Sequence, residues 1–154
     1  MKTALPLVLA AVLFASTNSA HAFDTTPSSP APAADLKTAQ TKIAAGDFNS
    51  AIPVLKNYIT AHPTDADGFN LLGYSLRKTG QTDAALQYYN QALALVPRHL
   101  GANEYLGELY VEIGRMNKAK ERLAVLQAAC GNCEQERDLA AFIQKGPGTK
   151  ARAW

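Results

Sequence analysis

The sequence predicts an all-α protein, an α-solenoid in which short helical hairpins stack on one another, and two observations lead to this prediction. The 154 residues include 28 alanines but only 11 valines and isoleucines together, a balance that favours helices over strands. Small or turn-forming residues also recur with a period of 34: Gly46, Gly80 and Gly114; Ala51, Ala85 and Ala119; Ala39, Gly73 and Gly107; Pro63, Pro97 and Gly131. Such a period is typical of repeated units that bury their apolar faces against their neighbours.

The first 22 residues are expected to be a signal peptide rather than part of the fold. Lys2 precedes an apolar run over 4–15, and Ala20-His21-Ala22 has the small-x-small pattern that predicts cleavage after Ala22. The run is shorter than the roughly 20 residues that a membrane-spanning helix needs, although an N-terminal membrane anchor is the alternative. We therefore expect a protein of the periplasm or a secreted protein, with no membrane insertion after cleavage.

The two segments that flank the helical part carry no helical periodicity. Residues 23–34 contain three prolines among Ser, Thr and Ala, which predicts an extended linker. Residues 146–154 open with Gly-Pro-Gly and are interpreted as a disordered tail, whose Trp154 either stays loose or docks on the body. Between these ends we expect three helical units and a capping helix, over 35–65, 66–99, 100–133 and 134–145.

The first unit, residues 35–65, ends its first helix at Gly46 and its second at Pro63. Pro53 falls inside that second helix, where proline normally breaks the hydrogen-bond ladder. With Asn49 as the N-cap, Pro53 would sit in the first turn, where backbone amides lack partners in any case. The sequence therefore predicts that the second helix starts just after Asn49.

The middle unit, residues 66–99, shows the pattern most clearly. Apolar residues at helical spacing end at Gly80, which predicts a first helix with a C-terminal glycine. Thr82 or Asp83 is expected to cap a second helix, which Pro97 terminates. The buried stripe of that helix would consist of Ala85, Leu86, Tyr89, Ala92, Leu93 and Val96. Gly73 and Ala85 are expected to be small because the two helices approach closely there.

The third unit, residues 100–133, closes with Gly131 inside the motif Cys130-Gly131-Asn132-Cys133. Residues 134–145 then predict one more short helix, with an apolar face of Leu139, Phe142 and Ile143. A half-polar helix of this kind suits the end of a repeat array.

Charge and motifs argue against nucleic-acid binding and catalysis. The 15 basic and 13 acidic side chains leave a net charge of +2, so no basic surplus exists to neutralise many phosphates. No histidine has a metal-spaced companion, and no serine sits in a nucleophile elbow. His62 and His99 are expected near the C-terminal ends of second helices, where they would face exposed carbonyls. The sequence predicts neither an enzyme nor a cofactor.

The repeated positions resemble the tetratricopeptide repeat. The middle unit matches the family pattern best, at Phe69, Leu72, Gly73, Leu76, Gly80, Ala85, Tyr89, Ala92 and Pro97. The resemblance covers residues 32–133 and implies a right-handed α-solenoid of three repeats plus a capping helix. It also implies a non-catalytic protein-protein interaction scaffold or adaptor, in whose concave groove a segment of another protein binds.

The family register implies that nine residues of the first helices lie on the groove side: Gln40, Asn70, Tyr74, Arg77, Lys78, Glu104, Glu108, Val111 and Glu112. The three glutamates are spaced four apart and form one acidic stripe, whose like charges oppose the helix. Arg77 and Lys78, or water, would neutralise this stripe. Alternatively, a ligand would place a basic segment there and an acidic one near Arg77 and Lys78. Because Gln40, Tyr74 and Glu108 stand where the family's carboxylate-binding groove needs Asn, that specificity is not inherited.

Cys130 and Cys133 leave three interpretations open. A disulfide would pin the third unit to the capping helix, in keeping with the oxidising compartment that an exported protein meets. A redox-active pair would make the chain a thiol-disulfide helper in envelope protein or cytochrome maturation, although no strand precedes the motif. Free thiols or a metal site shared between chains is the third interpretation. A structural link in an envelope assembly is a further class of function.

Overall fold

A computed structural model describes residues 35–148 of the chain. The expected signal peptide over 1–22, the expected linker over 23–34 and the last six residues of the expected tail lie outside the described residues. Within the described range, no helix is both long and apolar enough to cross a membrane.

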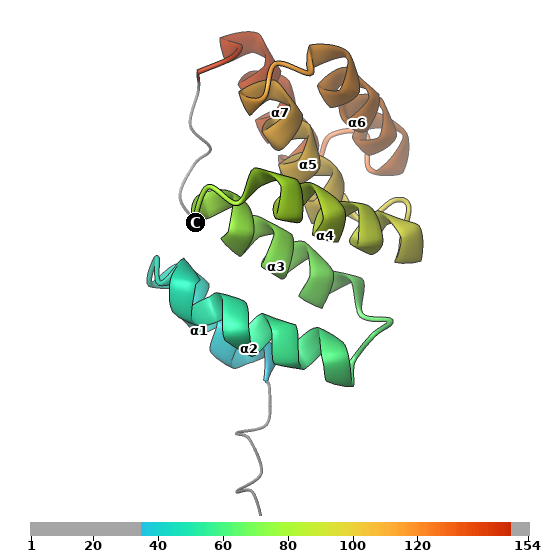
Figure 1. The fold of residues 1–154 in the computed structure, drawn as a ribbon. Helices are drawn as coiled ribbons and strands as arrows, with labels where there is room; N and C mark the ends of the chain where they lie inside the picture. The colour runs from blue at the N-terminus through green and yellow to red at the C-terminus, as the bar shows by residue number, and fades with distance from the viewer. Residues whose placement is uncertain (1–34, 149–154) are drawn as a thin grey trace, which may run out of the picture. The chain divides into compact units, whose positions relative to one another are not determined.

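Residues 35–148 form seven α-helices, and none of these residues is in a β-strand (Figure 1). The helices are α1 (Leu36–Ala44), α2 (Phe48–Ala61), α3 (Ala66–Lys78), α4 (Thr82–Leu95), α5 (Leu100–Glu112), α6 (Met116–Ala129) and α7 (Glu134–Lys145). Three hairpins, α1 with α2, α3 with α4 and α5 with α6, follow one another, and α7 packs on both helices of the third. The predicted all-α helical-repeat solenoid is confirmed.

The first helices of the hairpins and α7 contact one another in chain order, α1 with α3, α3 with α5 and α5 with α7. We call these four helices the first-helix layer, and α2, α4 and α6 the second-helix layer. Each second helix also packs against the first helix that follows it. The central helix α3 is therefore enclosed, burying ten of its 13 residues, whereas α4 buries three of 14.

The glycines that define the period are needed for their backbone conformation and not because a side chain would clash there. Gly46, Gly80 and Gly114 have φ values of 74°, 78° and 74°, in the left-handed region that other residues rarely adopt. A Cβ at any of the three would meet no atom within 4 Å. The residue after each glycine donates its N–H to a carbonyl five residues earlier, as Gln81 does to Leu76 at 2.8 Å. Each hairpin turn is thereby completed in three residues.

This tight turn moves the start of α2 forward from the predicted position. Asp47, directly after the turn glycine, is the N-cap, and its carboxylate accepts the N–H of Ser50 at 3.2 Å. The helix begins at Phe48, so the prediction that Asn49 caps it is wrong. Pro53 consequently lies inside the helix rather than in its first turn.

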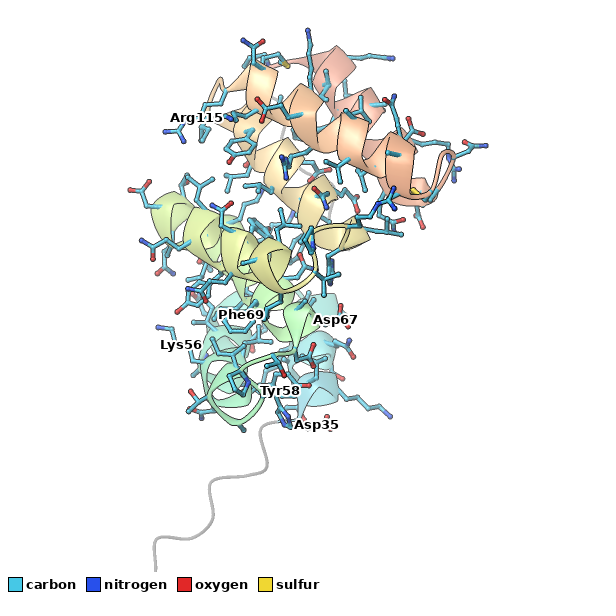
Figure 2. The ribbon with its side chains drawn as sticks, turned by 90° about the vertical axis from the view of Figure 1, so that its right-hand side faces the viewer. Asp35, Lys56, Tyr58, Asp67, Phe69 and Arg115 are labelled. Atoms are coloured by element: carbon cyan, nitrogen blue, oxygen red, sulfur yellow. A yellow bond between two sulfur atoms is a disulfide. The ribbon has the colours of Figure 1, made fainter. Side chains whose placement is uncertain are left out.

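The same turn explains the start of the other second helices. Gln81 is the N-cap of α4 and makes no side-chain capping hydrogen bond, so the prediction that Thr82 or Asp83 caps this helix is wrong. Arg115 occupies the equivalent position before α6, also without a side-chain cap (Figure 2). The residue after the glycine is already at the cap position, whatever its side chain.

Tyr58 of α2 fills the seam between the first and second hairpins (Figure 2). A Cβ added at Gly68 of α3 would lie 2.8 Å from the Tyr58 ring. The Tyr58 hydroxyl donates to the carboxylate of Asp65, the residue that caps α3. Gly68, which the sequence pattern does not single out, is therefore needed to admit this ring.

Two further glycines leave room for a side chain of a facing helix. A Cβ at Gly73 would lie 2.8 Å from the Tyr89 ring of α4, so the glycine makes space for that ring within one hairpin. A Cβ at Gly107 would lie 2.5 Å from Leu139 of α7. Gly73 and Gly107 occupy the same position in their repeats. In the middle repeat the glycine makes room for a side chain of the second helix of its own hairpin, and in the third repeat it makes room for a side chain of the capping helix α7.

Replacing Gly73 with leucine is expected to lower the free energy of unfolding by about 1–3 kcal/mol, because the new side chain would displace the fully buried Tyr89 ring. A thermal or urea melt followed by circular dichroism measures this loss. Ala94→Leu, at an exposed site on α4, adds apolar volume without a clash and should change the melt little. Equal melts for Gly73→Leu and wild type would contradict the packing described.

Candidate functional site

Arg77 of α3 lies inside the first-helix layer and binds two glutamates of α5. Its Nη1 donates to Glu108 Oε2 at 2.7 Å. Its Nε and Nη2 donate to the two carboxylate oxygens of Glu112 at 3.0 and 2.8 Å, a bidentate pair. Of the two explanations for the acidic stripe, neutralisation by Arg77 is therefore the one that the structure shows for Glu108 and Glu112.

The surroundings of Arg77 keep its guanidinium in place and charged. The side chain is 2% exposed, and its Nη1 also donates to the carbonyl of Tyr105. Its Cζ lies 6.0 Å from the ring centre of Phe142 on α7. Burial alone would lower the pKa of Arg77, but the hydrogen bonds to Glu112 and the nearby glutamate charges raise it above its usual range. The ion-pair cluster thus joins α3 and α5 under α7.

Several of the nine predicted groove residues belong to the core instead. Tyr74 and Val111 are at most 1% exposed, and Asn70, Arg77, Glu104 and Glu108 are between 5% and 8% exposed, so the expectation that these six residues line an open groove is wrong. The reason is packing between first helices and across to α7. Tyr105 packs on Tyr74, and Phe142 joins the cluster that covers Val111.

The other predicted groove residues differ widely in exposure. Gln40 of α1 is exposed, and the Glu112 side chain keeps 27% of its surface. Lys78 is half-buried, with its Nζ 5.3 Å from the ring centre of Tyr74. Burial, followed by the charge of Arg77, lowers the pKa of Lys78. The structure thus brings Arg77, Lys78, Glu108 and Glu112 together and leaves Gln40 apart.

Glu104 is the third glutamate of the stripe, and it has a different environment from the other two. It is 8% exposed and makes no hydrogen bond or ion pair with any residue of 35–148. Asn70 of α3 is also buried, and its Oδ1 has no donor within the described part of the chain. Glu134 and Asp138 of α7 lie near enough for their charges to act on Glu104. Two acceptors that lack donors therefore occur beside an acidic helix.

His99 lies at the start of α5 rather than at the end of α4. Its Nδ1 accepts the N–H of Ala102 at 3.1 Å, which makes it the N-cap of α5. Its Nε2 is 2.9 Å from Asp67 Oδ1 at the start of α3. The expectation that His99 faces the carbonyls at the end of a second helix is wrong, because the chain turns within three residues after Val96.

Cys130 and Cys133 flank the turn between α6 and α7. Cys130 is the C-cap of α6, Cys133 is the N-cap of α7, and the two Sγ atoms are bonded in the structure. Gly131 between them has a φ of 70°. The bond closes the connection through which the capping helix is attached to the third repeat.

We expect the purified, unreduced protein to contain no free thiol, which labelling under native and denaturing conditions measures. In the chain-entropy model, closing so short a loop stabilises the fold by about 2 kcal/mol at most. Reduction should therefore speed hydrogen exchange in α7 and leave α1 to α4 nearly unchanged. Two reactive thiols in unreduced protein would contradict this prediction.

Over residues 35–148, no group of three or more His, Cys, Asp or Glu side chains could hold a metal ion. What the described site offers is ion pairing, hydrogen-bond acceptors and packed aromatic side chains.

Two tetratricopeptide-repeat models match the chain, over residues 36–98 and 76–141. Uncharacterized protein ycf37 from Pyropia yezoensis is 34% identical over 71 residues, which are 43% of this chain and 40% of that protein. The chain therefore spans less than half the length of this curated relative.

Three solved structures share the fold at 24% sequence identity or less. MamA has a TM-score of 0.64 at 24% identity, covering 71% of this chain and 64% of MamA. The Yersinia enterocolitica type III secretion chaperone SycD, in complex with a peptide of the translocator YopD, has a TM-score of 0.62 at 18% identity, covering 71% and 83%. The second TPR domain of human RPAP3, in complex with the HSP70 peptide SGPTIEEVD, has a TM-score of 0.63 at 18% identity, covering 70% and 90%.

Together the family matches cover 36–141, which includes all three hairpins and most of α7. The period of 34, the left-handed turn glycines and the stacked hairpins are the features that such repeats share. The chain belongs to the tetratricopeptide repeat family.

Proposed function

We propose that this chain is a non-catalytic scaffold or adaptor that binds a segment of a partner protein on its first-helix layer. The observation that supports the proposal most strongly is the fold itself, because two structural neighbours are seen with bound peptides, SycD with a YopD peptide and RPAP3 with an HSP70 peptide. What distinguishes this layer is charged residues that pair between neighbouring first helices, as Arg77 does with Glu108 and Glu112, rather than a group of catalytic side chains. Repeat proteins of this kind offer long surfaces to extended partners.

The charges of the layer favour a basic partner segment over an acidic one. Arg77, one of the two cations that an acidic segment would need, is already bound by Glu108 and Glu112 and is 2% exposed on its side chain. The HSP70 peptide seen on RPAP3 carries the acidic sequence EEVD. A segment of that charge would meet Glu104 and the acidic start of α7 here, so we propose a basic segment at the third repeat and abandon an acidic one at Arg77.

The proposed location is the periplasm or the extracellular medium, on the grounds of the signal-peptide pattern over 1–22. The competing function, a thiol-disulfide helper, would act through Cys130 and Cys133. The reduction potential of the pair distinguishes the two: a value well below about −300 mV fits a structural bond, and one near about −200 mV fits exchange.

An affinity pull-down with matched charge reversals tests the binding face. Glu134→Lys places a cation at the start of α7 beside Glu104, and Glu121→Lys makes the same change at an exposed site on α6. We expect the partner captured from the native envelope fraction by wild type to be lost with Glu134→Lys and retained with Glu121→Lys. Circular dichroism of both variants checks the fold. Equal capture by the two variants would contradict binding on the first-helix layer.

A further inference from the structure

His99 differs in chemistry from the other side chains that cap the described helices. The carboxylates of Asp35, Asp47 and Asp65 accept a backbone N–H at the starts of α1, α2 and α3. His99 lies 34 residues after Asp65, at the same position of the next repeat, and its Nδ1 accepts the N–H of Ala102 at 3.1 Å. A carboxylate stays ionised down to about pH 4, whereas an imidazole nitrogen stops accepting as soon as it takes up a proton. The cap of α5 is therefore sensitive to a range of pH in which the aspartate caps are not.

The two ring nitrogens of His99 have fixed roles in this turn. Because Nδ1 accepts a hydrogen bond, the single proton of the neutral ring is on Nε2, which donates to Asp67 Oδ1 at 2.9 Å. A further proton can be added only at Nδ1. It would face the N–H of Ala102, so the hydrogen bond that caps α5 would be lost. The cap is compatible only with the neutral ring.

The charges around the ring act in opposite directions on that second proton. Among residues 35–148, Asp67 of α3 is the one charged side chain within hydrogen-bond distance of the ring, and it favours the cation. Asp65, at the start of the same helix, is bound by the Tyr58 hydroxyl and by the N–H of Asp67. The amides at the start of α5 oppose the cation, because the N-terminal end of a helix carries a partial positive charge. Protonation thus keeps the contact with Asp67 and removes the cap.

Two arginines bind this turn at atoms other than the ring. Arg98 Nη2 donates to the carbonyl of Ala128 at the end of α6. Arg122 of α6 donates to Asn103 Oδ1, and Asn103 Nδ2 donates to the His99 carbonyl at 2.9 Å. These hydrogen bonds do not involve the imidazole and remain whatever its charge. Loss of the cap is therefore expected to loosen the first turn of α5 without unfolding the repeat.

We propose that His99 is a proton-operated cap, through which acidification loosens the first turn of α5 while the contact with Asp67 keeps α5 joined to α3. The response of the turn does not depend on the proposed function. Its effect on binding rests on that function, because the turn lies directly before the acidic stripe of α5, near which a basic partner segment is proposed to bind. Binding at the third repeat would then respond to the acidity of the surroundings.

Nuclear magnetic resonance of the purified chain tests the cap. The ¹⁵N resonances of the His99 ring report which nitrogen carries a proton, and hydrogen exchange reports the protection factor of the Ala102 amide. Between pH 8 and pH 5 we expect this protection factor to fall about fivefold as Nδ1 takes up its proton, which is the effect of losing a typical N-cap. The Ser50 amide should stay constant, because the hydrogen bonds with Ser50 lower the pKa of the Asp47 carboxyl that caps it. A proton on Nδ1 at pH 8, or an Ala102 amide that does not respond when the ring is protonated, would overturn the proposal.

Replacing each described histidine by asparagine separates the cap from other effects of acid. His99→Asn keeps a good N-cap acceptor that takes up no proton, so the protection of Ala102 should be equal at pH 5 and pH 8. His62→Asn removes the other histidine of residues 35–148, exposed at the end of α2, and should leave the fivefold response unchanged. A response of wild-type size in His99→Asn would overturn the proposal.

Asp67→Asn tests the contact with α3 while His99 is kept. The asparagine oxygen still accepts from Nε2, but the charge that favours the cation is gone, so Ala102 should lose its protection at a lower pH than in wild type. Loss at the same pH or a higher one would contradict the role given to Asp67. Because no partner protein is present in any of these measurements, their failure is distinct from a failure of the pull-down that tests the proposed function.

Discussion

Replacing Arg77 with methionine is expected to lower the free energy of unfolding by about 3–5 kcal/mol, the usual cost of breaking a buried ion pair from one side. The variant would leave Glu108 and Glu112 without their cation, on the same helix as the unpaired Glu104. Methionine keeps an unbranched apolar side chain in the buried position and removes only the guanidinium, which pairs with the glutamates and lies over the Phe142 ring, so the loss reports the charged group. Urea unfolding at neutral pH, followed by circular dichroism, measures it.

The matched control removes the charges together. Adding Glu108→Gln and Glu112→Gln to the Arg77→Met variant takes away the uncompensated carboxylates and should recover most of the lost stability. Lys56→Met, an exposed change on α2, should leave unfolding within about 0.5 kcal/mol of wild type. An Arg77→Met protein as stable as wild type would show that the cluster is not what holds α3 to α5.

Leu139→Ala is expected to cost about 2–5 kcal/mol, the range for truncating a fully buried leucine. Leu139 of α7 is 0% exposed and lies against Gly107, which has no side chain to fill the resulting cavity. The capping helix should then detach more readily than the hairpins unfold. Hydrogen exchange would show faster exchange in α7 than in α1 and α2.

Leu95→Ala provides the comparison for this truncation, because Leu95 of α4 is 39% exposed and its loss opens no buried cavity. We expect it to change the urea midpoint little. If Leu139→Ala changes the urea midpoint as little as Leu95→Ala does, α7 is an appendage rather than part of the repeat stack.

The period of 34 predicts the helix order well because it records backbone geometry. The glycines at 46, 80 and 114 mark left-handed turns that few other residues can make, so the pattern survives whatever the side chains do. The caps were predicted less well for the same reason. Asp47 and Gln81 occupy cap positions because of the preceding turn, although only Asp47 has a side chain that caps. A capping residue type in the sequence therefore shows which side chains can cap a helix. It does not show at which residue a short turn ends and the helix begins.

The candidate site was predicted only in part, since spacing along one helix says nothing about what faces it. The four-residue spacing of the glutamates correctly places them on one face of α5. It does not show that Arg77 pairs with Glu108 and Glu112 but not with Glu104. The pairing follows from how α3 packs against α5 and α7, where the guanidinium also contacts the Tyr105 carbonyl and the Phe142 ring. Long-range packing of this kind has no local sequence pattern.

Site-specific photocrosslinking most directly tests the claim that the first-helix layer is the binding face. A photoreactive residue at Gln40, exposed on α1, is compared with one at Gln87, exposed on α4 of the second-helix layer. We predict that the partner retained in the pull-down crosslinks to position 40 and not to position 87. Crosslinking at position 87 alone would contradict the account and place recognition on the second-helix layer.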